Sequence, residues 1–332
     1  MTITLNPSKV VQELRGFHVE TERDRDFRKQ LNRILIVEDD GTGNPSCVPA
    51  KYTADLETRG VLVIEPSGGG KTTAIRRVLE GTAALGINPD TQMPRYLQIQ
   101  VPSPATLKSV GLAILDATGM SGVKEKTPVW EIWDMVRHRL KLLGIVVLWL
   151  DEAQDLILAK SIQETENAIR MLKSIMQGEN GVVLVLSGTQ QLAQMANLDP
   201  QVSRRFTKIV PRALEMGADE EGLESLIGSY CEAAGLAPKV SDDLASRLIR
   251  GSRQRFGRAV ETIVNAIECA LLDEDSSLTD AHFSEAWAMQ EGCEIVDNIF
   301  DTPDWLSVPL DVAAEEFEDA RVRRQKKKLE KA

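Results

Sequence analysis

A chain of 332 residues, 42% hydrophobic and 27% charged, is long enough to bury a sizeable core, and this composition excludes wholesale disorder. The net charge of −11 excludes a uniformly basic nucleic-acid-binding coat but not a local basic patch. The cysteines form no CxxC pair and indicate neither a zinc site nor a disulfide scaffold; they are Cys47, Cys231, Cys269 and Cys293. The sequence has no apolar export signal and no run of about 18 apolar residues, so we expect a cytoplasmic protein without a membrane partner.

The N-terminal residues, 1–50, are polar and contain a charged helical stretch, Thr21 to Leu35, followed by the turn-rich DDGTGNPS. We expect a largely helical extension that packs on the main domain or on a partner.

Short apolar runs alternate with helical stretches in residues 51–212. The runs are VLVI (61–64), YLQIQV (96–101), IVVLWL (145–150), VVLVLS (182–187) and the weaker KIV (208–210). Near-continuous β-branched runs of this length are typical of strands buried on both faces, and the alternation predicts right-handed crossovers and a parallel sheet. Residues 213–292 instead carry apolar residues at helical spacing, which predicts a small helical domain. Residues 293–332 are expected to be a linker and a basic tail.

The stretch EPSGGGKTT follows the first apolar run and nearly matches the phosphate-binding loop GxxxxGK[ST], except that Glu65 replaces the first glycine. Consecutive glycines let backbone N–H groups surround phosphate oxygens, and a following helix N-terminus adds partial positive charge. We expect Lys71 to hold the β- and γ-phosphates and Thr72 to bind Mg²⁺. The loop is expected to work despite Glu65, and Glu65→Gly to leave ATP binding equal or tighter. The expected nucleotide-binding residues are Ser67, Gly68, Gly69, Gly70, Lys71, Thr72 and Thr73.

The strand IVVLWL ends in Asp151 and Glu152, and two adjacent carboxylates at the end of a buried strand are costly unless they bind a metal or do chemistry. Asp151 fits the Mg²⁺-binding carboxylate and Glu152 the base that polarises the attacking water. The next strand ends in SGT, where Thr189 or Ser187 is a candidate γ-phosphate sensor.

Three arginines are candidates for stabilising transferred phosphate charge. Arg204 and Arg205 precede the last short strand, and either could reach the γ-phosphate of a neighbouring subunit. Arg258, at the start of a helix in the small domain, could close over the same phosphate.

The order of the motifs along the chain resembles that of an AAA+ ATPase: the phosphate loop, DEAQ, SGT, SRRF and the helix FGRAVETIVNA. Within that superfamily the chain most resembles the transposition ATPases of the TniB and TnsC type, on VPSPATLKSVGLAILDATG, LSGTQQL and RFGRAVETI. The likeness covers roughly residues 25–292. It implies an α/β AAA+ core, a parallel sheet between helices, followed by a helical lid, with ATP and Mg²⁺ as cofactors.

The resemblance also implies a function. The protein is expected to assemble into a ring or helical filament on duplex DNA without sequence preference, to choose a target site and to recruit a DDE transposase. A target-selector protein is expected as a further partner. The resemblance makes Arg205, with Arg204 as the second choice, the arginine that acts across the subunit interface. The segment after the second strand is implied to face DNA, with candidates Thr106, Lys108, Lys124 and Lys126. The acidic total and Glu65 depart from the family pattern.

Two alternatives remain open from the sequence. A replication initiator or helicase loader would share every nucleotide motif, although no helix-turn-helix segment is evident after residue 292. A nucleotide-gated scaffold would bind ATP without turnover, but it would have no need of Glu152. The basic tail, which carries Arg321, Arg323, Arg324, Lys326, Lys327, Lys328 and Lys331, is either a solvated helix end or a DNA- or partner-binding segment.

Overall fold

The computed structural model describes residues 6–38, 45–157, 162–193 and 200–310. The chain divides into two compact units. The first, which we call the sheet unit, is His18–Arg212; the second, the helical unit, combines Met1–Phe17 with Ala213–Ala332. Residues 1–50 are therefore shared between the two units. No helix among the described residues combines the length and apolar character needed to cross a bilayer.

The sheet unit is built on five strands: β3 (Gly60–Ile64), β4 (Tyr96–Gln100), β5 (Val147–Asp151), β6 (Val183–Gly188) and β7 (Phe206–Ile209). They pair in the order β4-β5-β6-β3-β7, and all pairs are parallel. The apolar runs of the sequence thus form one parallel sheet, which confirms the predicted α/β class. Because every strand points the same way, the residues that follow β3, β5 and β6 lie at the same sheet edge.

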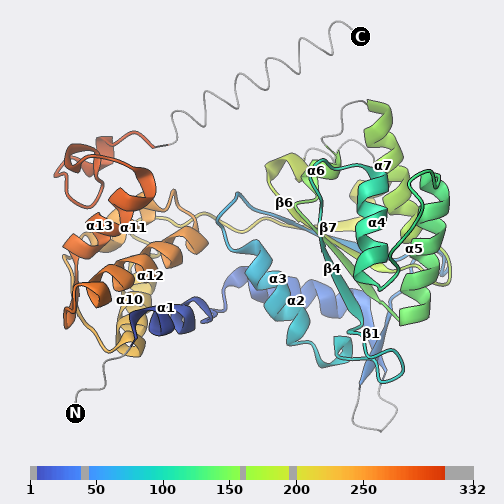
Figure 1. Cartoon of the computed structure of the whole chain (residues 1–332), viewed down its shortest axis with the longest axis horizontal. Helices are drawn as coiled ribbons and strands as arrows, with labels where there is room; N and C mark the ends of the chain where they lie inside the picture. Colours follow the sequence, from blue (N-terminus) through green and yellow to red (C-terminus); the bar gives the residue numbers. More distant parts are fainter. Residues whose placement is uncertain (1–5, 39–44, 158–161, 194–199, 311–332) are drawn as a thin grey trace, which may run out of the picture. The chain divides into compact units, whose positions relative to one another are not determined.

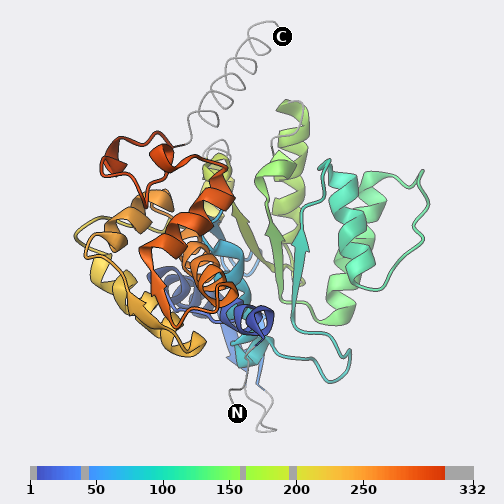
Figure 2. The same cartoon turned by 60° about the vertical axis from the view of Figure 1, so that its left-hand side comes forward.

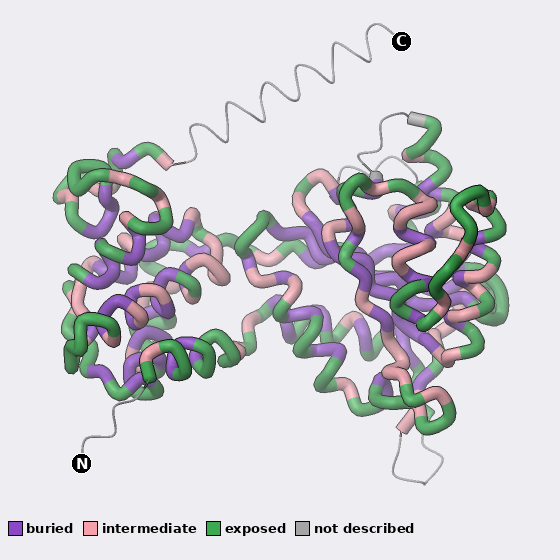
Figure 3. The backbone as a smooth tube through the Cα atoms, in the orientation of Figure 1, coloured by how far each residue is buried: buried purple, intermediate pink, exposed green. Residues whose placement is uncertain are grey.

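Helices cover both faces of this sheet (Figures 1 and 2). One face packs against α4 (Leu107–Ala117), α5 (Val129–Leu143), α6 (Gln154–Ile157) and α7 (Ile162–Ile175). The other face packs against α2 (Glu22–Ile34), α3 (Lys71–Glu80) and the 3₁₀ turn η1 (Ala83–Leu85). Strands β3, β5 and β6 are buried along their whole length, as the central band of Figure 3 shows. Burial on both faces explains why these strands are continuously apolar.

The described part of the sheet unit also contains a strand pair and a short helix. The strands β1 (Leu35–Glu38) and β2 (Ser46–Pro49) form an antiparallel pair next to α2. Helix α9 (Pro200–Arg205) leads directly into β7.

The described part of the helical unit contains five helices: α1 (Pro7–Arg15), α10 (Glu220–Ala234), α11 (Leu244–Gly251), α12 (Phe256–Leu272) and α13 (Asp280–Glu291). It also contains the short parallel pair β8 (Ala237–Lys239) and β9 (Ser277–Thr279). The 3₁₀ turns η2 (Ile295–Asp297) and η3 (Trp305–Ser307) follow α13. Helix α1 packs on α10 and α12 through an apolar face that buries Val10, Val11 and Leu14.

The segment after α13 packs on the helical unit. Ile299 is fully buried, and Arg247 on α11 donates from Nη1 to its carbonyl at 2.9 Å. Arg250, one turn further along α11, donates from Nη2 to the carbonyl of Val308 at 2.9 Å. Two arginines of one helix therefore fix the backbone of a segment that the sequence places in a linker.

Candidate nucleotide-binding site

The loop between β3 and α3 has the backbone of a phosphate cradle. Gly68 and Gly70 have φ values of 80° and 102°, in the left-handed region that favours glycine. Gly70 is the N-cap of α3, so the N–H groups of the first helical turn have no partner within the helix and carry partial positive charge toward the loop. The expected nucleotide-binding residues all lie in this loop and turn: Ser67, Gly68, Gly69, Gly70, Lys71, Thr72 and Thr73.

Lys71 and Glu152 meet at this edge of the sheet. The Lys71 ammonium lies 3.1 Å from Oε1 of Glu152, and Gln154 donates to Oε2 of the same carboxylate at 2.7 Å. Burial alone would raise the pKa of Glu152, but the hydrogen bonds from Gln154 and Lys71 and the lysine charge together hold this pKa below its usual value. The carboxylate is therefore ionised at neutral pH, the state that a proton acceptor requires.

The second carboxylate, Asp151, is buried and accepts two hydroxyl hydrogen bonds. Thr72 donates to Oδ2 at 2.7 Å, and Ser187 donates to Oδ1 at 2.6 Å. Trp149, on the same strand as Asp151, donates its indole N–H to the Ser187 hydroxyl at 2.7 Å. Thr72 and Asp151 thus present hard oxygen atoms side by side, which fits Mg²⁺. Ser187 acts here as the group that orients Asp151.

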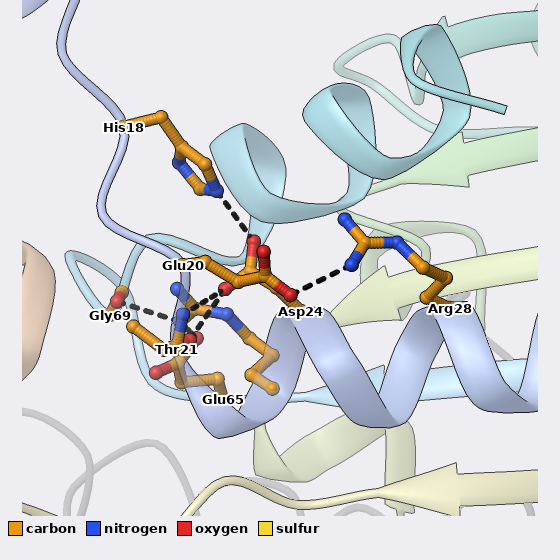
Figure 4. Close-up of polar contacts among 8 residues, drawn as sticks. His18, Glu20, Thr21, Asp24, Arg28, Glu65 and Gly69 are labelled. Atoms are coloured by element: carbon orange, nitrogen blue, oxygen red, sulfur yellow. Dashed lines mark hydrogen bonds and ion pairs between the residues drawn. The ribbon is translucent and has the colours of Figure 1, made fainter.

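The acid in the place of the first loop glycine is held by an ion pair (Figure 4). Arg23, on α2, donates from Nη1 to Oε2 of Glu65 at 2.7 Å and to the carbonyl of Gly69 at 2.9 Å. The two side chains are only 5% and 10% exposed. A Cβ on Gly69 would lie 2.1 Å from Cδ of Glu65, so the bent-back carboxylate fits only against glycine. One helix therefore braces the phosphate loop through the residue that departs from the motif.

The start of α2 is fixed by a second set of polar contacts, also drawn in Figure 4. The fully buried Asp24 accepts from the Thr21 backbone at 3.0 Å and from its hydroxyl at 2.5 Å, and lies 2.7 Å from Nε2 of His18. Burial would raise the pKa of Asp24, but the Thr21 hydrogen bonds and the charges of His18 and Arg23 outweigh it and lower this pKa. This capping network fixes the turn of α2 that carries Arg23.

The two candidate arginines before β7 lie at the opposite edge of the sheet. Phe206 pairs with Gly60, the first residue of β3, so Arg204 and Arg205 lie at the end of β3 that is far from the phosphate loop. Arg205 is 5% exposed and pairs with Glu57 at 2.7 Å, whereas the Arg204 side chain is 54% exposed and pairs with the same carboxylate at 2.8 Å. Both arginines are thus held by one buried acid.

Sequence reasoning missed these partners of the candidate residues: Arg23, Glu57, Trp149 and Gln154. It also missed the residues that cap α2: His18, Thr21 and Asp24. The DEAQ motif contains Gln154, and its position two residues after Glu152 was the available signal. The contacts of Arg23 with Glu65 and of Glu57 with Arg205 join residues distant in the chain, so no local pattern could have indicated these pairs.

The remaining candidates lie elsewhere. Arg258 is on α12 in the helical unit, where its Nη1 is buried and has no hydrogen-bond partner among the described residues. Thr106 caps α4, and Lys108 contacts the carbonyl of Glu125 in the α4–α5 loop, which also carries the exposed Lys124 and Lys126. The three DNA-binding candidate lysines are thus brought to one region. The basic tail falls outside the described residues.

The parallel sheet, the glycine cradle before α3 and the paired carboxylates after β5 define the class: an AAA+ P-loop ATPase. The chain belongs to the bacterial TniB family, because the family model described as Bacterial TniB protein matches residues 50–215. No curated protein matches the sequence significantly.

Solved structures show the same fold at low identity. The ORC1 protein of Aeropyrum pernix, solved in complex with DNA, is 20% identical, with a TM-score of 0.52 over 71% of this chain and 60% of that one. The ORC2 protein of Aeropyrum pernix is 18% identical, with a TM-score of 0.54 over 84% and 73%. Cdc6p from Pyrobaculum aerophilum is 16% identical, with a TM-score of 0.55 over 81% and 67%. This chain therefore spans less than two thirds of the ORC1 protein.

Proposed function

We propose that the protein binds and hydrolyses ATP with Mg²⁺, oligomerises on duplex DNA, marks a target site and recruits a DDE transposase. Membership of the TniB family and the geometry of the phosphate loop support this function. ATP binding drives assembly on DNA in this proposal, and hydrolysis reverses it. The assembly is a ring or a helical filament.

The observation that carries the proposal is the position of the arginines at the sheet edge opposite the phosphate loop. Arg204 and Arg205 precede Phe206, which pairs with the first residue of β3, and Lys71 lies beyond the last residue of β3. The strand therefore separates them from Lys71 by about 15 Å or more. Neither arginine can serve the ATP of its own subunit. If one of these two stabilises γ-phosphate charge, it acts on a neighbouring copy, and the complete site requires an oligomer.

Of the two arginines, the burial of Arg205 favours Arg204, which the sequence placed second. Arg205 would have to leave a buried ion pair with Glu57, whereas the Arg204 side chain is already half exposed. Glu57 would stay paired with Arg205 when Arg204 turns to a neighbour.

The residues that follow β3, β5 and β6 form what we call the nucleotide edge, and each of those discussed here has a proposed role in hydrolysis. The loop N–H groups and Lys71 bind the β- and γ-phosphates, and Thr72 and Asp151 would hold Mg²⁺, which supplies positive charge to the phosphate oxygens. Glu152 orients a water and takes its proton as the water oxygen bonds to the γ-phosphorus and the bond to the β–γ bridging oxygen breaks. Thr189 is proposed to sense the γ-phosphate from the end of β6, and Arg258 of α12 stays a candidate for the same role, on its sequence motif.

The DNA-binding candidates Lys108, Lys124 and Lys126, with Thr106, are proposed to contact phosphates. Such contacts carry no base information and release counterions, so binding would be independent of sequence and would weaken strongly with salt. This behaviour suits a protein that accepts many targets, with a transposase and a target selector as its protein partners.

The experiment that tests this function is electron microscopy of the protein with duplex DNA and a non-hydrolysable ATP analogue. We expect ordered rings or filaments on DNA for the natural protein and none for Lys71→Ala, which loses the phosphate-binding ammonium. With ATP, Glu152→Gln should stay on DNA because it binds ATP but cannot take the proton. DNA association of Lys71→Ala at the natural level would contradict ATP-driven assembly.

A replication initiator or helicase loader is the second candidate, favoured by the fold shared with the ORC and Cdc6 proteins. Strand transfer by a DDE transposase, measured with and without this protein, separates the two functions. A nucleotide-gated scaffold would assemble as above but show no phosphate release.

A further inference from the structure

Gln154 uses both ends of its side-chain amide at the nucleotide edge. It is the first residue of α6 and is 7% exposed. Its Nε2 donates to Oε2 of Glu152 at 2.7 Å, and its Oε1 accepts from the backbone N–H of Thr189 at 3.2 Å. Turning the amide over would set oxygen against carboxylate and NH₂ against N–H, so only one orientation satisfies both partners. Gln154 therefore bridges the end of β5 and the end of β6.

The glycine of the SGT strand end leaves room for this bridge. A Cβ on Gly188 would lie 2.1 Å from Oε1 of Gln154 and 3.3 Å from a methyl group of Leu192. The first of these contacts is far shorter than real Cβ contacts, so the amide and any larger residue at position 188 exclude each other. Gly188 and Gln154 thus form one packed arrangement beside Glu152.

We infer that Gln154 is a positioning residue for ATP hydrolysis: its amide ties one carboxylate oxygen of Glu152 to the backbone of the sensor residue Thr189. The inference rests on the proposed function. The other oxygen, Oε1, pairs with Lys71. Phosphate oxygens would compete for that lysine, so nucleotide would release Oε1 toward water while Gln154 keeps Oε2 in place. The proton acceptor is then oriented by the strand that senses the γ-phosphate.

The test is Gln154→Met in the full chain, which keeps the length of the side chain and removes both hydrogen bonds. We expect ATP binding within about twofold of the natural protein and a kcat about 10- to 100-fold lower, the loss typical of a misplaced reacting group. The loss should therefore appear in kcat and not in the KM for ATP. Gln163→Met is the matched control, since Gln163 is an exposed residue of α7, and it should leave kcat unchanged.

A double-mutant cycle tests the packing independently. Gly188→Ala should lower kcat by displacing the amide. In a Gln154→Ala background the added methyl group has room, so it should lower kcat little further. Additive losses would mean that Gly188 acts by another route and would overturn the bridge.

Failure of the inference and failure of the proposed function give different results. If the natural protein releases no phosphate from ATP, the proposed function fails; the crystal structure of Gln154→Met should still show the Glu152 carboxylate displaced from the position that the amide gives it. If the natural protein hydrolyses ATP and Gln154→Met matches or exceeds its kcat, the positioning role is overturned. A loss of ATP binding equal to the loss of kcat would assign Gln154 a structural role and also overturn it.

Discussion

At the scale of single residues, Glu65 explains how a phosphate loop can begin with an acid. The first loop position ends β3 and makes no cradle of its own, so a side chain is tolerated there if its charge is neutralised. Arg23 neutralises it in a buried pair and also donates to the loop carbonyl of Gly69. The sequence predicted a working loop in which the glutamate is an altered hinge residue. The structure instead makes it half of an ion pair on which the loop rests.

The expected effect of Glu65→Gly is therefore the reverse of that predicted from the sequence. The substitution leaves the Arg23 guanidinium buried without its acid, and breaking a buried pair from one side costs about 3–5 kcal/mol. We expect a loss of this order in the free energy of unfolding by urea, and weaker ATP binding.

The control for this substitution is Glu20→Gln, which breaks an exposed pair with Arg28 that is also close to the start of α2. Surface pairs contribute up to about 1 kcal/mol, so little change is expected. Unfolding and ATP binding of Glu65→Gly equal to those of the natural protein would contradict the bracing role of the pair.

At the scale of elements, the sequence predicted what depends on local pattern. Buried parallel strands are continuously apolar, so the runs such as 61–64 and 182–187 mark β3 and β6 within one residue. The loop and the DE pair were found because the chemistry needs fixed residue types next to a strand. The partners of these residues were not found, since Arg23 meets Glu65 across 42 positions and Arg204 meets Glu57 across 147. Only the folded sheet unit brings them together.

Helix α1 shows the same limit and allows a direct test. The sequence predicted an N-terminal extension that packs on the main domain or on a partner. Helix α1 instead packs on α10 and α12 of the helical unit, with Leu14 only 1% exposed. Leu14→Ala should destabilise the helical unit by about 2–5 kcal/mol, as expected for a buried leucine. Native-state hydrogen exchange of α12 amides measures this loss. Gln12→Ala, at an exposed position of the same helix, should change protection little; equal effects would contradict the packing of α1.

At the scale of the whole molecule, the proposed roles of Lys71 and Arg204 would make a single subunit incomplete. Lys71 would bind the ATP of its own chain, whereas Arg204 lies at the opposite sheet edge and would serve the ATP of another. Residues needed for one reaction would then be supplied by two copies of the same sequence.

Mixing two inactive variants tests this arrangement. Lys71→Ala lacks ATP binding but keeps its arginine, and Arg204→Ala binds ATP but lacks the arginine. Each alone should release little phosphate, whereas an equimolar mixture should recover part of the natural rate, because the arginine of one variant completes the nucleotide site of the other. No recovery in the mixture would contradict action between subunits. Recovery with Arg205→Ala instead of Arg204→Ala would identify Arg205 as the arginine that acts.

The contact among Arg23, Glu65 and Gly69 also constrains how this loop can evolve. Replacing Glu65 alone by glycine leaves the buried Arg23 guanidinium without its acid. Adding a side chain at position 69 alone creates a collision with Glu65. Each change is therefore harmful unless another accompanies it. We therefore expect the three positions to change together, although they lie in a helix, at a strand end and in a loop. Replacing Glu65 by the glycine of the common motif would therefore be tolerated only if the buried Arg23 were replaced as well.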